Sequence, residues 1–446
     1  MAEVKEKGKL PEGWKLVRLG EVANFFKGRK YLKADIDYEG KYEFIHYGEL
    51  FTTYKEHIKE IISRIDKDDG AFTSRINDVL MPTSDVTPAG LATASCIKKD
   101  GVILGSDILV IRILSDLEGI FLSYLIRLKK TKILQLVKGT TVYHLYASDL
   151  KNFVFPLPPP PEQRKIAEIL ETIDNAIEKT DRVIEKYKRI KQGLMQDLLT
   201  KGIDERGQIR SEKTHRFKDS PLGSRVPEEW EVMKLEEILQ KTNNAIKIGP
   251  FGSQLKKDEM VEEGYKVYGQ ENVFNKDFNI GNRFITKQKY KELKSCALEP
   301  GDFVISMMGT IGKCAIVPNN IKEGVMDSHL IRLKVNDQVF YKELLVYLIE
   351  ESSCIQKQII NLSVGGIMQG LNSSIVKSLL VPHPSLTEQQ YIASVLSQID
   401  EVIRREQKYK EKLERIKKGL MGDLLTGKVR VNHLIEKNKK GVVDES

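Results

Sequence analysis

Two long stretches of the chain carry apolar residues three and four positions apart, which is the period of one face of an α-helix. They cover residues 162–199 and 388–425. Each predicts a helix of about 38 residues, roughly 57 Å long at about 1.5 Å per residue. A stripe of that length cannot be buried in one small domain, so we expect the two helices to bury their stripes against each other. The expected seam contains Ile173, Ile177, Ile399 and Ile403.

The second stretch repeats the first. Both begin with Glu-Gln-x-x-Ile-Ala and both end with Gly-Leu-Met-x-Asp-Leu-Leu-Thr, at a constant distance of 226 residues. A shorter repeat precedes each variable segment, because Pro-Glu-Gly-Trp14 returns as Pro-Glu-Glu-Trp230. These are the 2 tryptophans of the chain. The chain therefore contains one plan twice, a variable segment followed by a long helix.

The variable segments have a mixed α/β pattern. Helices are predicted at 120–136 and 340–360, and short apolar runs predict strands at 42–46, 78–81, 102–104, 108–113, 302–306, 314–317 and 329–335. The expected fold class is α+β, with two mixed α/β domains separated by two long helices that form an antiparallel coiled coil. An antiparallel pair would place the domains at opposite ends and create a pseudo-twofold internal repeat.

The repeats also predict boundaries. A polar linker rich in glycine and proline follows the first helix, and a tail follows the second. The expected segments are domain one at 1–158, helix one at 159–201, the linker at 202–226, domain two at 227–384, helix two at 385–426 and the tail at 427–446. At the helix starts, Pro161 suits a first turn, and Thr387 with Gln390 is expected to form a capping box.

Composition and charge exclude fewer classes of function than the repeats do. The net charge is +8, but no segment is a basic block, so DNA binding would require folding to gather the charges on one face. No apolar run reaches membrane-spanning length and no secretory signal is visible, so we expect a cytoplasmic protein. The 4 cysteines form no CxxC pair and the 7 histidines are scattered, so no metal site is predicted.

The order of these motifs, found twice, resembles the specificity subunits of Type I restriction-modification systems. Phe217-Lys-Asp-Ser-Pro-Leu-Gly223 and Gly249-Pro-Phe-Gly-Ser253 add to the resemblance. It implies that each variable segment is a target-recognition domain for one half of a bipartite double-stranded DNA target. It further implies that the helices set the half-site spacing and dock two modification (methyltransferase) subunits, which a restriction (translocase/endonuclease) subunit joins. S-adenosylmethionine, ATP and magnesium are then expected in the partner subunits, and no cofactor in this chain.

The motifs of catalysis are missing from the sequence. The Pro-Pro run at 158–161 lacks the Asn/Asp/Ser-Pro-Pro-aromatic order of adenine methyltransferases. Gly309-Thr-Ile-Gly312-Lys313-Cys314 is not a P-loop, because cysteine stands where a magnesium-binding Ser or Thr is needed. We therefore predict a non-catalytic DNA-binding subunit. Two alternatives remain at this point, a coiled-coil adaptor with two protein-binding end domains and a nuclease fused to recognition domains.

Candidate DNA contacts follow from residue type, since Lys and Arg bind phosphates and Arg, Lys, Asn and Gln read base edges. We expect each cluster to be a better guide than any one member. In domain one the candidates are Lys27, Arg29, Lys30 and Tyr31, with a second loop of Lys138, Thr140, Thr141, Tyr143 and His144. In domain two they are Lys247, Ser253, Gln254, Lys256, Lys257, Gln270, Asn272 and Gln369.

Overall fold

The computed structural model describes residues 10–114, 116–251, 254–363 and 370–435. Its contacts divide the chain into two units. One unit takes Met1–Arg182 with Gln407–Ser446, and the other takes Val183–Glu406. Each unit therefore contains one mixed α/β domain and one half of each long helix.

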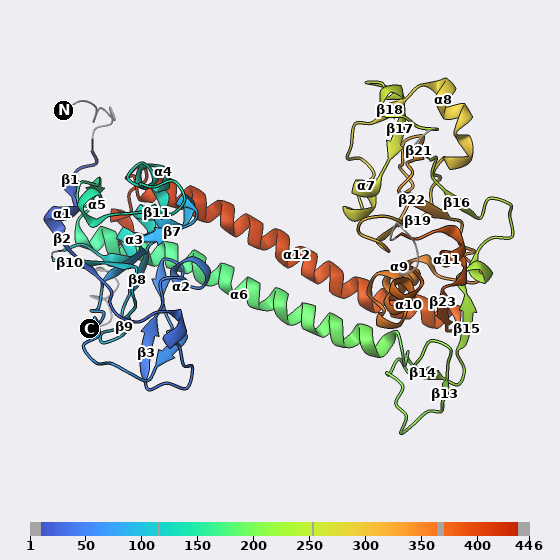
Figure 1. The fold of residues 1–446 in the computed structure, drawn as a ribbon, viewed down its shortest axis with the longest axis horizontal. Coiled ribbons are helices and arrows are strands. Elements are labelled where there is room, and N and C mark those ends of the chain that lie inside the picture. Colours follow the sequence, from blue (N-terminus) through green and yellow to red (C-terminus); the bar gives the residue numbers. More distant parts are fainter. Residues whose placement is uncertain (1–9, 115, 252–253, 364–369, 436–446) are drawn as a thin grey trace. The chain divides into compact units, whose positions relative to one another are not determined.

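The two long helices, α6 (Pro160–Leu198) and α12 (Leu386–Leu424), are the predicted pair, and each has 39 residues. They lie side by side (Figure 1). In the first unit Asp174 pairs with Lys417 and Asp181 with Lys410, so residue numbers rise along one helix as they fall along the other. This confirms antiparallel packing. Of the helices in the described ranges, none is long and apolar enough to cross a membrane.

The helix starts are partly as predicted. Pro160 and Pro161 both lie in the first turn of α6, where a missing N–H leaves no helical bond unmade. The capping box at Thr387 is wrong, because α12 already begins at Leu386. Ser385 precedes the helix instead, and its hydroxyl accepts a hydrogen bond from the Glu388 backbone N–H at 3.3 Å.

The apolar stripe is buried unevenly. Ile177 is 5% exposed, whereas Ile173, Ile399 and Ile403 are half-buried. Ile190 and Ile416 continue the stripe in the sequence but are 38% and 39% exposed. Successive helical residues point about 100° apart, and the neighbouring lysines at 191 and 417 face the partner helix in their place.

The first domain is built on a five-stranded sheet in the order β2-β10-β6-β8-β4, beside a three-stranded sheet in the order β5-β3-β9 (Figure 1). Strand β3 is antiparallel to β5 and parallel to β9. The strands are β2 (Ala23–Lys27), β3 (Tyr42–Ile45), β4 (His57–Ile58), β5 (Ser63–Ile65), β6 (Val79–Pro82), β8 (Ser95–Ile97), β9 (Ile103–Leu104) and β10 (Ile108–Ile113). Two further pairs are β1 (Lys15–Arg18) with β12 (Val154–Leu157) and β7 (Ser84–Asp85) with β11 (Tyr143–His144). The short helices are α1 (Leu19–Val22), α2 (Glu49–Thr52) and α5 (Ala147–Leu150).

The second domain repeats this topology. Its four-stranded sheet has the order β16-β22-β19-β20, and its three-stranded sheet the order β18-β17-β21, again with one antiparallel and one parallel pair. The strands are β16 (Ile246–Ile248), β17 (Tyr265–Tyr268), β18 (Phe284–Ile285), β19 (Phe303–Ser306), β20 (Cys314–Ile316), β21 (Gly324–Met326) and β22 (Leu330–Leu333). The remaining pairs are β13 (Phe217–Asp219) with β14 (Arg225–Pro227) and β15 (Glu231–Lys234) with β23 (Leu380–His383). Short helices are α7 (Gln270–Phe274), α8 (Lys287–Glu292) and α11 (Ser373–Ser378).

The predicted strands are all present, but each predicted domain helix is two helices. The first is α3 (Gly119–Leu128) and α4 (Lys130–Leu134), and the second is α9 (Lys342–Glu351) and α10 (Ser353–Ser363). Ser352 has extended backbone angles between α9 and α10. The bend lets Leu344 of α9 and Ile355 of α10 reach the same apolar core.

A buried glutamate at the start of each long helix explains both repeated motifs. In the first unit Glu162 is 1% exposed. It accepts hydrogen bonds from the Trp14 indole at 2.9 Å and from Arg430, beyond the end of α12, at 2.7 Å. Charge-assisted bonds of this kind are strong when they are removed from water. The opening tryptophan of the repeat is therefore tied to the start of its helix.

Glu388 has the same place in the second unit. It accepts from the Trp230 indole at 3.2 Å and from Arg210, in the segment after α6, at 3.2 Å. In each unit the helix starts beside its own domain, and an arginine that follows the other helix closes the ion pair. The repeated Trp and Glu-Gln motifs thus build one structural joint twice.

We expect truncation of a buried stripe residue to destabilise the protein much more than truncation of an exposed one. Ile177→Ala should lower the free energy of unfolding by about 2–5 kcal/mol, because it leaves a cavity at a buried position. Ile416→Ala is the matched control and should change it by about 0.5 kcal/mol or less. Chemical denaturation of both variants measures the difference. Equal effects would contradict the burial pattern of the helix pair.

Candidate nucleic-acid interface

A close backbone crossing places the first basic cluster on the surface of domain one. After β2, the N–H of Gly28 donates to the carbonyl of Ile108 at 2.8 Å. A Cβ at position 28 would lie 2.1 Å from the carbonyl oxygen of Gly105, so only glycine fits. The crossing brings out Arg29 and Lys30, which are both exposed.

The second predicted loop is a closed hairpin. Lys138 and His144 exchange two backbone hydrogen bonds of 2.9 Å and 2.7 Å. Gly139 turns the chain with φ +121, and Thr140 and Thr141 are exposed at the tip. Tyr143 and His144 form β11 and pair with β7, which anchors the hairpin to the domain.

These two clusters are distant in sequence, but each contributes one residue to the same pocket. Lys27 and His144 both line a hollow of about 340 Å³. Its wall includes Phe26, which is 37% exposed, and Tyr146, which is 49% exposed and stacks on His144 with ring centroids 5.9 Å apart. Asp107 lies in the same wall and forms an ion pair with Lys27 at 3.0 Å.

The pocket adds groups that the sequence prediction missed. A carboxylate such as Asp107 can accept from the amino group of cytosine, a hydroxyl such as Thr83 can pair with either kind of base edge, and an apolar wall can contact the thymine methyl group. One weak similarity between the two domains, Ser106-Asp-Ile-Leu in the first and Asp327-Ser-His-Leu in the second, was the available sequence signal for these loops. Phe26 and Tyr146 gave no such signal, because only tertiary packing brings them together.

Tyr31 is buried beneath the basic loop and is not available on the surface. Its side chain is 5% exposed and its hydroxyl donates to Asp69. That hydrogen bond raises the pKa of Tyr31 to about 12, so the phenol remains a donor. Lys30 forms an ion pair with the same carboxylate at 2.7 Å. We therefore assign Tyr31 to the support of the basic loop.

Domain two repeats the backbone crossing. Gly249 donates to the carbonyl of Leu330 at 3.0 Å, and a Cβ there would lie 1.8 Å from the carbonyl oxygen of Asp327. The chain that follows exposes Phe251. Gln254, Lys256 and Lys257 are exposed beyond it. Ser253 and Gln369 lie outside the described residues.

The other candidates of domain two differ in accessibility. Lys247 and Gln270 are half-buried, and the Gln270 amide donates to the carbonyl of Met308. Asn272 is fully buried. Its amide donates to the carbonyls of Asp277 and Ile280 at 3.1 Å and 2.9 Å and accepts from Gly269. These bonds make Asn272 part of the loop's framework, so we leave it out of the interface.

A charged network beside Gly249 was also missed from the sequence. Arg283 binds Asp327 at 3.0 Å and Glu271 at 2.9 Å. His329, with its side chain 49% exposed, lies 3.4 Å from Asp327. The network lies at the loop that Gly249 crosses. The equivalent loop of domain one, which Gly28 crosses, carries Asp107. Among the described residues, no three His, Cys, Asp or Glu side chains are grouped as a metal site requires.

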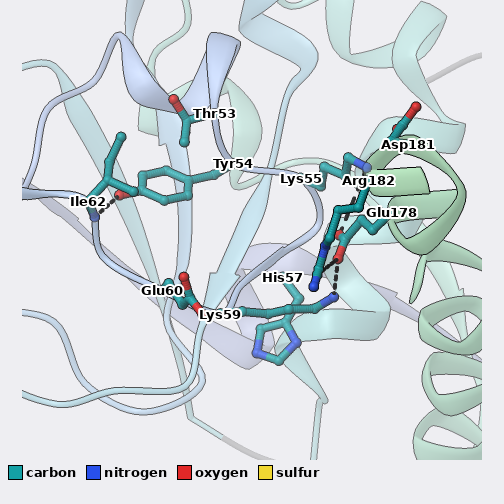
Figure 2. A pocket seen from close by; sticks show the side chains of 10 residues that line it. All are labelled: Thr53, Tyr54, Lys55, His57, Lys59, Glu60, Ile62, Glu178, Asp181 and Arg182. Atoms are coloured by element: carbon teal, nitrogen blue, oxygen red, sulfur yellow. Dashed lines mark hydrogen bonds and ion pairs between the residues drawn. The ribbon is translucent and has the colours of Figure 1, made fainter. Parts of the chain in front are cut away.

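A second hollow, of about 420 Å³, lies between domain one and the first half of α6. Figure 2 shows Lys55, Lys59 and Arg182 near the carboxylate of Glu178. The ion-pair distances are 3.9, 2.9 and 3.9 Å. Glu60 and Asp181 also line the hollow, so its three cations face three carboxylates and leave no excess of positive charge for a phosphate contact.

The sequence matches the Type I restriction modification DNA specificity domain twice, over residues 11–186 and 227–415. The chain belongs to the Type I restriction-modification specificity subunits. It is thus the DNA-recognition, non-catalytic part of such a system. The assignment favours DNA reading over the coiled-coil adaptor and over the fused nuclease.

Individual relatives agree with this family. The chain is 29% identical over 438 residues to the Type I restriction enzyme MjaVIII specificity subunit of Methanocaldococcus jannaschii, covering 96% of this chain and 95% of the relative. It is 23% identical over 265 residues to the EcoBI specificity subunit of Escherichia coli, covering 58% of this chain and 54% of that one.

Solved structures share the fold of this specificity subunit. The S subunit of a Type I restriction-modification system from M. genitalium has a TM-score of 0.59 at 19% identity, covering 95% of this chain and 98% of that one. A chain from a structural study of complex assembly in the Type I system has a TM-score of 0.52 at 19% identity, covering 95% and 100%. The duplicated domains and paired helices are therefore a fold already known in this family.

We expect Arg29 to act as a phosphate contact. Arg29→Gln should weaken DNA binding by the assembled complex about equally for all sequences, because phosphate contacts carry no base information. It should reduce the slope of log affinity against log salt by about 0.9. Lys15→Gln, on the separate β1–β12 ladder, is the matched control and should leave the slope unchanged. Fluorescence anisotropy at several salt concentrations gives both slopes, and an unchanged Arg29→Gln slope would remove this residue from the interface.

Proposed function

We propose that each domain of this specificity subunit reads one half of a bipartite double-stranded DNA target. The observation that carries the proposal is the repeated domain topology, with the same glycine crossing at Gly28 and Gly249. Two readers of one architecture and different surface residues suit two half-sites of different sequence. The wall of the pocket at Lys27 and His144 supplies hydrogen-bonding and apolar groups for one of them.

The charge distribution supports the same reading. The net charge of +8 is modest for a DNA-binding protein of this length. Folding nevertheless brings Lys27 of the first basic cluster to the same pocket as His144 of the hairpin, and Arg29 and Lys30 are exposed shortly after Lys27 in the chain. Local concentration of cations, rather than total charge, determines where a phosphate backbone binds.

The proposed assembly contains partner subunits. Two modification subunits would dock on the helix pair and provide S-adenosylmethionine chemistry, and restriction subunits would use ATP and magnesium. The M. jannaschii and E. coli relatives are specificity subunits of Type I restriction enzymes. A related chain comes from a study of the assembly of such a system. A cytoplasmic location, where DNA and these partners meet, belongs to the same proposal.

We expect the two domains to be exchangeable readers. Replacing residues 12–155 by the matching domain of a relative should change one half of the methylated site and leave the other half unchanged. The reason is that the Trp14–Glu162 hydrogen bond, whose motif is repeated in the second unit, attaches the domain to the start of α6 in a fixed way. Methylation mapping of cells that express the chimera with its modification subunits measures this. A change in both halves by a folded chimera would contradict modular reading.

We also expect the helix pair to set the spacing of the half-sites. Four residues inserted after Asn175, with a matching insertion after Glu401, add about one helical turn and about 6 Å to each helix. The apolar stripe then returns nearly to its original direction. DNA rises about 3.4 Å per base pair, so the gap should grow by one or two base pairs while the half-site sequences persist.

Insertion of two residues at the same places is the control. It rotates the following stripe by about 200° and should abolish the packing rather than lengthen the gap. Methylation mapping distinguishes the two variants. An unaltered gap in an active four-residue variant would show that the helices do not determine the spacing.

A further inference from the structure

A buried tyrosine, aspartate and lysine meet in the first unit where three elements join. Asp174 of α6 accepts from the Tyr124 hydroxyl of α3 at 2.5 Å through one oxygen, and pairs with Lys417 of α12 at 2.7 Å through the other. The Lys417 ammonium also lies 5.3 Å from the centre of the Tyr124 ring. It forms a second ion pair with Glu56 of the domain at 2.8 Å.

The second unit contains the same triad with the helices exchanged, but here the aspartate is more accessible: the Asp400 side chain is 40% exposed and the Lys191 side chain 17%. Asp400 of α12 accepts from the Tyr347 hydroxyl of α9 at 2.8 Å and pairs with Lys191 of α6 at 2.7 Å. The ammonium lies 5.4 Å from the centre of the Tyr347 ring. Asp400 and Lys417 stand 226 residues after Asp174 and Lys191, the distance of the sequence repeat.

Both tyrosines are held in the donor state. Burial, reinforced by the Asp174 carboxylate, raises the pKa of Tyr124 well above its ordinary value. Burial and the bond to Asp400 do the same for the pKa of Tyr347. Each aspartate therefore has one oxygen bound to a neutral hydroxyl and the other bound to a cation. Few other placements of the helices would satisfy both oxygens.

The triads specify one alignment of α6 with α12. The numbers of the paired residues add to the same total in both triads and in the exposed pair Asp181–Lys410. A slip of either helix by one turn would separate both Asp–Lys pairs. Because Asp174 and Lys417 are largely buried, with side chains 8% and 16% exposed, the slip would leave charges without partners in a site of low polarity.

The apolar contacts of the helix ends are less selective. In the first unit Ile166 and Leu170 of α6 share a core with Leu424 of α12, and Leu420 packs against that core. Aliphatic side chains spaced by three and four positions can exchange partners after a slip of one turn. A buried polar group is the kind of contact that distinguishes one register from another.

We propose that the two Tyr–Asp–Lys triads are positioning elements that hold α6 and α12 in a single register, and that this register sets the length of the gap between the two DNA half-sites. The proposal rests on the proposed function, in which each domain reads one half-site. Domain one leads directly into α6 and domain two leads directly into α12. On that function, a one-turn change of register between the helices would shift one reader along the helix axis relative to the other.

The test replaces both aspartates by their neutral isosteres, Asp174→Asn with Asp400→Asn, in the chain assembled with its modification subunits. The readout is the gap length in every methylated site of a randomised-spacer DNA library. A slip of one turn is about 5.4 Å, so sites with gaps one or two base pairs away from the wild-type length should become methylated. The half-site sequences should remain unchanged.

Two variants serve as controls. Asp174→Glu with Asp400→Glu keeps both carboxylates and should restore the single gap length. Asp181→Asn removes the exposed pair, whose side chains are 41% and 32% exposed, and should not broaden the gap. If the asparagine variant does not fold, Tyr124→Phe with Tyr347→Phe decides, because it retains both ion pairs and should broaden the gap less.

A single wild-type gap length in the active asparagine variant, or in the phenylalanine variant where that one decides, would overturn the proposal. Broadening by Asp181→Asn to the same degree would also overturn it, since an ion pair outside the triads would then hold the register as well as the triads do. Failure of the proposed function gives a different result. In that case the wild-type complex itself would methylate no bipartite sequence, before any variant is compared.

Discussion

A helix of 39 residues with one apolar stripe needs a partner of equal length, and this chain supplies two such helices. Their antiparallel packing is the constraint on which the rest of the structure depends. It requires the chain to return along its own first helix, and it places the end of each helix beside the start of the other. The duplicated sequence is the simplest way to build such a pair.

Charged groups along this helix pair recur at equivalent positions in both units. Glu162 and Glu388 join each tryptophan to the start of its helix, and an arginine that follows the opposite helix completes each joint. Asp174 and Asp400 then tie a domain helix to both long helices. Removing one partner of a buried pair such as Asp174–Lys417 is strongly destabilising because the remaining charge stays buried. These groups add geometric definition that aliphatic contacts alone do not supply.

The sequence was sufficient to predict the long helices, the duplication and the α/β character of the domains, because these depend on periodicity and on repeated motifs. It was not sufficient for details that tertiary contacts decide. Thr387 was a reasonable cap by residue type, but α12 begins at Leu386, and Ser385, two residues before Thr387, accepts the capping hydrogen bond. The break at Ser352 lets α9 and α10 reach the same apolar core, and no glycine or proline marks it in the sequence.

The residues of the candidate interface were likewise predictable from the sequence only in part. Basic, glycine-containing loops identified Lys27, Arg29 and the hairpin that ends at His144, and the structure brings Lys27 and His144 to one pocket. Residue type alone could not distinguish Asn272, whose amide is used inside its own loop, from an exposed reader. Residue type also could not show that Tyr146 lines the pocket and stacks on His144, because tertiary packing brings the two rings together.

The most direct test of the account is methylation mapping of DNA modified by this chain together with its modification subunits. The account predicts one bipartite motif, two short specific sequences separated by a non-specific gap of a single length. A continuous motif, or two unrelated motifs methylated independently of each other, would contradict it.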